Sequence, residues 1–167
     1  ILSGLVGSEM CIRDRRYPGL ILYSEIFQLT GPVQRLAAWL AGHGYVVAVP
    51  EIFHEFEPLG KVLAYDKEGT DRGNWCKINK RLGSYDSDTK AVIQFLQGYK
   101  NCTGKLGAIG ICIGGHLSFR ASFESQILAS VCFYATDIHK LESHPRGLGL
   151  GMADDSLEKA RAGAISG

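Results

Sequence analysis

Residues 110–115, Gly-Ile-Cys-Ile-Gly-Gly, have the types and spacing to place a reactive thiol at Cys112. The segment lies between a strand-like run and a helix-like run, and such a turn holds its central residue in a strained backbone conformation. The residues two positions to either side must then lack bulk, as Gly110 and Gly114 do. The first N–H groups of the helix favour a thiolate and a developing oxyanion. We therefore predict a nucleophilic Cys112; the alternative is a structural cysteine in a tightly packed turn.

The elements around this turn alternate between strands and helices. Residues 19–24 and 45–50 are short apolar runs typical of strands buried on both faces, and residues 31–42 between them have apolar side chains at helical spacing. This order is a βαβ unit, in which the two strands are parallel. Further elements are expected along the rest of the chain: a helix from one of residues 86–88 to about Gly98, a strand at 105–111, a helix at 114–123, a strand at 128–134 and a short helix near 155–162.

The repeated order of strand and helix predicts the fold class. We expect an α/β protein with a doubly wound, mostly parallel sheet in a three-layer αβα arrangement. Residues 51–82 are polar and contain several glycines, so they are predicted to form a long irregular loop that borders the active site.

Two motifs together resemble the dienelactone hydrolase family of the α/β-hydrolase superfamily. They are Ser24-Glu-Ile-Phe27 directly after the first predicted strand and Gly-x-Cys-x-Gly-Gly at 110–115. The resemblance covers about residues 17–167 and implies a hydrolase of small ester or lactone substrates, for which we expect no cofactor. It also implies that Cys112 is the nucleophile and that Glu25 interacts with its thiol.

The resemblance assigns further site residues. By analogy, the oxyanion is held by the backbone N–H groups of Ile26 and Ile113. Arg72 lies where the family has an arginine that holds the substrate carboxylate. For Glu25 and Arg72 the alternative is a solvated loop side chain, which is the more common role of such residues.

The family's aspartate and histidine follow the cysteine in the chain order Cys, Asp, His. No residue after Gly167 is present to supply them, so we expect a C-terminally truncated and inactive fragment. Asp137 and His139 follow the last predicted strand and are possible substitutes for the orienting acid and the base, but the family places this segment beside the catalytic residues. His116 is expected to pack within the helix after the turn.

Composition excludes several functional classes. The 167 residues are 46% hydrophobic and 21% charged, and the formal net charge is +1, which is typical of one globular domain without a nucleic-acid-binding face. No run of about 18 apolar residues could span a membrane. The chain has five cysteines without CxxC spacing, which indicates a reducing compartment, and we expect a cytoplasmic location. The sequence has no metal-ligand pattern, so we expect a metal-free mechanism.

Residues 1–15 are set apart from the predicted domain at 16–167. They show no clear strand or helix periodicity and resemble translated library adaptor, so we expect a non-native tail. The alternative is a targeting peptide. For the chain as a whole, two alternatives to a hydrolase remain open: a non-catalytic binding module with the same fold, in which Cys112 is a silent or redox-sensitive thiol, and an inactive product of a gene model.

Overall fold

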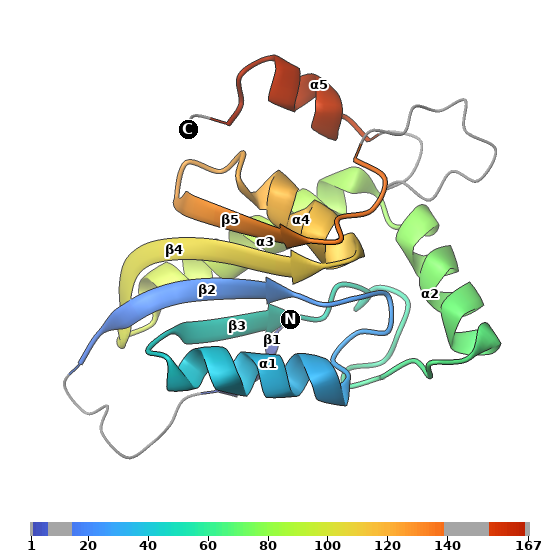
Figure 1. Ribbon diagram of the computed structural model, residues 1–167, viewed down its shortest axis with the longest axis horizontal. Coiled ribbons are helices and arrows are strands. Elements are labelled where there is room, and N and C mark those ends of the chain that lie inside the picture. Colours follow the sequence, from blue (N-terminus) through green and yellow to red (C-terminus); the bar gives the residue numbers. More distant parts are fainter. Residues whose placement is uncertain (1, 7–14, 139–153, 166–167) are drawn as a thin grey trace.

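The computed structural model describes residues 2–6, 15–138 and 154–165, and within them a five-stranded sheet forms the centre (Figure 1). Strand β2 is parallel to β3 and β4, β4 is parallel to β5, and β1 is antiparallel to β3. This mostly parallel sheet confirms the predicted fold class. In spatial order the strands are β1 (Leu2–Val6), β3 (Val46–Pro50), β2 (Tyr17–Tyr23), β4 (Cys102–Ile111) and β5 (Ile127–Phe133).

Helices cover both faces of the sheet. Helix α1 packs on one face, and α3 and α4 pack on the other, so the chain forms three layers (Figure 1). Helix α2 lies at the carboxyl edge of the parallel strands, and α5 lies beside α4. The bounds are α1 (Gly31–Gly42), α2 (Lys67–Asn79), α3 (Leu82–Gly98), α4 (Ile113–Ala121) and α5 (Ser156–Arg161).

The core follows from the two-residue period of the strands. In β2, Ile21 packs with Leu96 of α3 and Leu117 of α4, whereas the next residue, Leu22, packs on the opposite face with Ala37 of α1. All five are at most 2% exposed. Successive side chains of a strand point to opposite faces, so a parallel strand covered on both sides is apolar throughout. Burial of each leucine or isoleucine stabilises the fold by about 1.5–3 kcal/mol.

Helix α2 was not predicted, because its sequence lacks an apolar period. The Asp66 side chain caps it by accepting a hydrogen bond from the Gly69 N–H at 2.7 Å. Gly73 lets it approach the segment after β2 closely, since a Cβ there would lie 2.7 Å from the carbonyl oxygen of Ile26. The prediction of an irregular loop across residues 51–82 is therefore wrong for residues 67–79.

Other element boundaries shift by smaller amounts. Helix α3 begins at Leu82, about one turn before the predicted cap. The strand pattern did not predict β1, which pairs through its backbone with β3. Strands β2 to β5 end at the same edge of the sheet, and that edge is where ligands bind in open α/β sheets. None of the helices in the described residues is both long and apolar enough to cross a membrane.

Candidate active site

Cys112 occupies the turn between β4 and α4 in a strained conformation, with φ 60° and ψ −120°. An L residue other than glycine rarely adopts a positive φ and does so only where its surroundings hold it. Here the Cys112 N–H donates to the carbonyl oxygen of Phe133 at 3.0 Å. The Cys112 carbonyl oxygen in turn accepts from the N–H groups of Gly115 at 3.0 Å and Thr136 at 3.3 Å. The turn is therefore fixed by its own helix and by the segment that follows β5.

The glycines of this turn are required by close backbone contacts. A Cβ at Gly110 would lie 1.9 Å from the carbonyl oxygen of Gly114, and a Cβ at Gly114 would lie 2.3 Å from the carbonyl oxygen of Tyr23. A Cβ at Gly115 would lie 2.8 Å from the carbonyl oxygen of Phe133. Real Cβ atoms essentially never come this close to backbone atoms, so the steric prediction for Gly110 and Gly114 is confirmed.

Two free N–H groups lie at the same end of the sheet as Cys112. Ile113 is the first residue of α4, where an N–H has no partner within its own helix. In the described residues the Ile26 N–H likewise has no hydrogen-bond acceptor. The start of α4 packs directly on the end of β2, as the contact of Gly114 with Tyr23 shows. The N–H groups of Ile26 and Ile113 are thus available to bind an oxyanion.

The Cys112 side chain is a free thiol and is partly exposed, so a small molecule can reach it. Glu25, which the family resemblance places against the thiol, instead accepts a hydrogen bond from Tyr65 at 3.2 Å. Tyr65 also lies 3.1 Å from Oγ1 of Thr30, and its ring packs against Phe27 with a centroid separation of 4.4 Å. Within the described residues, the structure therefore pairs Glu25 with Tyr65 rather than with Cys112.

Arg72 lies on α2 and is held by neighbouring groups. Its Nε donates to Oε1 of Glu57 at 2.5 Å, and its Nη2 donates to the carbonyl oxygen of Phe56 at 3.2 Å. The guanidinium also lies over the ring of Trp75, 4.6 Å from its centroid. The hydrogen bond from Arg72 to Glu57 raises the pKa of Arg72. Since the Arg72 side chain is still 41% exposed, it keeps donor groups for a ligand carboxylate.

Asp137 forms an ion pair with Lys77 of α2, with Nζ and Oδ2 3.1 Å apart. Both side chains are nearly inaccessible to solvent, at 10% and 3% exposed. This pairing gives Asp137 a structural partner other than a histidine. His139, the other half of the substitute pair considered from the sequence, lies outside the described residues.

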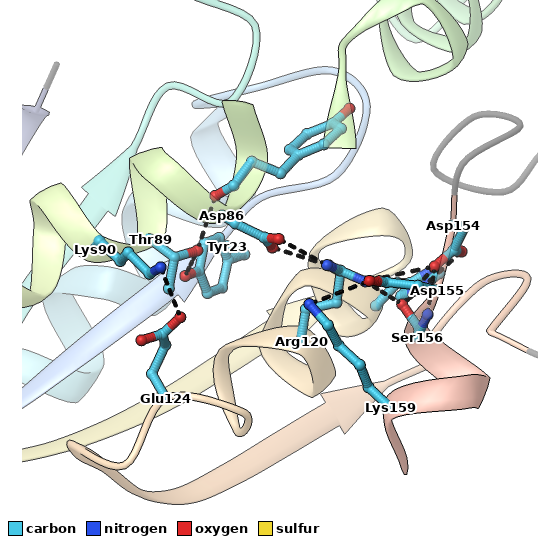
Figure 2. A network of polar contacts seen from close by, with 12 residues as sticks. Tyr23, Asp86, Thr89, Lys90, Arg120, Glu124, Asp154, Asp155, Ser156 and Lys159 are labelled. Carbon is cyan, nitrogen blue, oxygen red and sulfur yellow. Dashed lines mark hydrogen bonds and ion pairs between the residues drawn. The ribbon is translucent and has the colours of Figure 1, made fainter. Parts of the chain in front are cut away.

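Figure 2 shows a polar network that joins α4 to α3 and α5. Arg120 of α4 lies 2.8 Å from Asp86 of α3 and 2.6 Å from Asp155, which precedes α5. His116 is fully buried, and its Nε2 lies 2.9 Å from Oγ of Ser156. His116 therefore packs inside the protein, as expected, and anchors α4, the helix that follows the turn at Cys112.

Sequence reasoning missed Tyr65 and Lys77, because neither lies in a motif and their partners are 40 and 60 residues away. A cavity of about 440 Å³ lies near the start of α3, lined by Glu55, Arg81, Gly83, Ser84, Ser87 and Asp88. Neither Cys112 nor Arg72 lines it. No group of three or more His, Cys, Asp or Glu residues in the described part of the chain is arranged to hold a metal ion.

Comparison with known proteins gives a consistent assignment. The model of the dienelactone hydrolase family matches residues 5–149. A Saccharomyces cerevisiae protein named "Putative carboxymethylenebutenolidase" is 47% identical over 146 residues, which are 86% of this chain and 51% of that protein. A carboxymethylenebutenolidase from Pseudomonas putida is 22% identical over 125 residues, which are 74% of this chain and 52% of that protein. The chain thus spans about half the length of these relatives.

Solved structures show the same fold. A structure titled "m3DLH" superposes with a TM-score of 0.56 at 21% identity, over 70% of this chain and 46% of that one. A dienelactone hydrolase-like promiscuous phosphotriesterase, P91, from metagenomic libraries superposes with a TM-score of 0.51 at 19% identity, over 66% of this chain and 44% of that one.

Proposed function

The chain belongs to the dienelactone hydrolase family, and from this premise we propose that the full-length protein hydrolyses a small-molecule ester or lactone with Cys112 as its nucleophile. The observation that supports this proposal most is the backbone conformation of Cys112. This residue lies between β4 and the N-terminus of α4 and has a φ of 60°. A strained turn of this kind persists only when the surrounding contacts hold it, and such strain is concentrated at functional sites.

The proposed reaction is acyl transfer in two steps. The Cys112 thiolate attacks the carbonyl carbon, an S–C bond forms, and the carbonyl electron pair moves onto oxygen. The N–H groups of Ile26 and Ile113 stabilise this oxyanion. The intermediate collapses, the alkoxide leaves with a proton, and a thioester remains. Water then attacks the thioester, which releases the acid and restores the thiol.

The catalytic aspartate and histidine of this proposal come from the family resemblance. They follow the nucleophile in the family's chain order, and the matched part of this chain covers about half of the length of the relatives. The histidine would activate water for the second step and protonate the leaving group in the first. The proposal therefore concerns the full-length protein.

Two charged residues have proposed roles in the substrate site. Arg72 would bind a carboxylate on the substrate, since its guanidinium is fixed by Glu57 and remains partly exposed. Glu25 would control the protonation of the Cys112 thiol, because it follows β2 directly where the start of α4 packs on that strand. The hydrogen bond from Tyr65 would then define its resting position.

The test replaces the nucleophile in the full-length protein. Cys112→Ala should lower turnover of p-nitrophenyl acetate at least about a thousandfold, as is usual when a catalytic nucleophile is removed. Cys132→Ala is the matched control, because Cys132 is also a free and exposed thiol but lies within β5. Turnover by Cys112→Ala at the wild-type rate would overturn the proposed function.

A further inference from the structure

We propose that the buried ion pair between Lys77 and Asp137 positions the nucleophile of this site, with Lys77 acting as a positioning residue that holds the backbone of Cys112 through Thr136. The inference rests on the proposed function, since it concerns the same thiol. It deepens that function by assigning a role to two charged groups that the proposed reaction does not itself use.

The first step of the argument is the placement of the pair. Lys77 lies in the last turn of α2, and Asp137 follows β5, so the pair joins two segments at the carboxyl edge of the sheet (Figure 1). Nζ lies 3.1 Å from Oδ2 of Asp137, and the Lys77 side chain is 3% exposed. Taking an ammonium and a carboxylate out of water is unfavourable unless each has a partner. The ion pair therefore offsets part of the cost of burying both groups.

The second step connects the pair to the nucleophile. Nζ of Lys77 also donates to Oγ1 of Thr136 at 3.3 Å. The N–H of the same Thr136 donates to the carbonyl oxygen of Cys112 at 3.3 Å. Two consecutive hydrogen bonds thus lead from the buried ammonium to the backbone of the strained residue.

The third step is the tight packing of the segment that the pair holds. A Cβ at Gly115 would lie 2.8 Å from the carbonyl oxygen of Phe133 and 2.9 Å from Cα of Ala135, so this segment leaves no room behind α4. Asp137 itself has a φ of 62°, which an aspartate adopts at a cost. Because Lys77 holds the strained Asp137, the segment after β5 that contacts the Cys112 turn is kept in one conformation.

The far side of Lys77 is fixed as well. Its carbonyl oxygen accepts a hydrogen bond from the hydroxyl of Tyr85 at 3.3 Å, and Tyr85 is only 3% exposed. Helix α2 also carries Arg72, which lies five positions before Lys77. The ion pair therefore sets the distance between the helix proposed to bind substrate and the residue proposed to attack it.

The experiment separates positioning from stability in the full-length protein. The double variant Lys77→Met/Asp137→Asn removes both charges of the pair, so that neither is left without the other, and asparagine tolerates the positive φ at position 137. The matched control is Lys80→Met/Asp88→Asn, because Lys80 is also buried and its hydrogen bonds among the described residues go to Asp88 at 2.6 Å and to the carbonyl oxygen of Ile52. A third variant, Thr136→Val, removes only the hydroxyl that Lys77 contacts.

We measure kcat and KM for p-nitrophenyl acetate, together with urea unfolding. The Lys77/Asp137 double variant should lose at least about tenfold in kcat with KM unchanged, Thr136→Val should lose several-fold, and the Lys80/Asp88 control should keep its kcat. If the Lys77/Asp137 variant does not fold, the result for Thr136→Val decides. If the Lys77/Asp137 variant, or Thr136→Val in its place, keeps the wild-type kcat while Cys112→Ala is inactive, this inference alone is overturned. Full turnover by Cys112→Ala would overturn the proposed function instead.

Discussion

Oε2 of Glu25 accepts a hydrogen bond from the hydroxyl of Tyr65 at 3.2 Å, and this contact turns the carboxylate towards the 51–66 segment. A carboxylate beside a thiol disfavours the thiolate, because like charges repel. Removing the hydrogen bond with Tyr65→Phe frees Glu25 to turn towards Cys112. We therefore expect iodoacetamide to alkylate Cys112 several-fold more slowly at pH 7 in Tyr65→Phe, as measured by site-resolved mass spectrometry.

The carboxylate itself can be tested in the same assay. Adding Glu25→Gln to Tyr65→Phe removes the negative charge and should restore the alkylation rate of Cys112. Tyr45→Phe is the control, since Tyr45 is also an exposed tyrosine, 40% accessible, but precedes β3 at the amino end of the parallel strands, whereas Glu25 follows the carboxyl end of β2. Equal alkylation rates in Tyr65→Phe and the wild type would contradict a role for this hydrogen bond.

The glycines of the nucleophile turn make a prediction about stability. Gly114→Ala would place a Cβ 2.3 Å from a backbone oxygen at the end of β2, so we expect it to destabilise the fold by more than about 3 kcal/mol. Gly98→Ala in α3 meets no atom within 4 Å and should stabilise by about 0.5–1 kcal/mol. Urea unfolding of both variants measures the difference, and similar stabilities would rule out the steric account of the turn.

The contacts between α4 and α5 predict how stability depends on pH. Burial alone would raise the pKa of Asp154, but its contacts with His116 and Ser156 hold the pKa of this carboxyl well below its usual range. A lowered pKa in the folded state means that the unfolded chain binds a proton first as pH falls. The contribution of Asp154 is therefore complete above pH of about 4 and is lost below it.

Urea unfolding between pH 7 and pH 3 tests this dependence. The wild type should lose more stability than Asp154→Asn as the pH falls below about 4, because the variant has no carboxyl to protonate. At pH 7 the variant should be less stable by about 1–3 kcal/mol, since Asn cannot replace both oxygen acceptors. Parallel pH curves for the two proteins would show that Asp154 does not titrate in this way.

Arg72 makes a prediction about substrate charge. Arg72→Gln in the full-length protein should raise KM at least about tenfold for an ester that carries a carboxylate, because one charge-assisted hydrogen bond contributes about 1.5–3 kcal/mol. For p-nitrophenyl acetate, which is neutral, KM should stay the same. Lys67→Gln on the same helix is the control, since Lys67 is 90% exposed. A rise of KM for both esters would assign Arg72 a structural role through Glu57.

The tight turn at Cys112 was predictable from the sequence because its steric requirements are local. Gly110 and Gly114 are needed because a Cβ at either position would clash with backbone atoms. Such close contacts recur wherever a strand, a tight turn and a helix follow one another. The buried strands were predictable for a similar reason, since parallel strands covered on both faces are apolar throughout. Strand β2 shows this between Ile21 and Tyr23.

Helix α2 was not predictable, because tertiary contacts rather than an apolar period hold it. Its Gly73 approaches the backbone of Ile26, and its buried Lys77 is paired with the carboxylate of Asp137, 60 residues later. The partner of Glu25 depends in the same way on where Tyr65 lies. A sequence pattern that repeats every two or four residues carries no signal for such pairs.

The most direct test of the account is to trap the acyl intermediate. The full-length protein is mixed with p-nitrophenyl acetate, quenched in acid within milliseconds, digested and analysed by mass spectrometry. We predict an added acetyl group on the peptide that contains Cys112, formed before steady-state turnover and absent from Cys112→Ala. Hydroxylamine at neutral pH, which cleaves thioesters, should remove this acetyl group. Hydrolysis that proceeds without acylation of Cys112, or an acetyl group that accumulates on another residue at the rate of turnover, would contradict the assignment of Cys112 as the nucleophile.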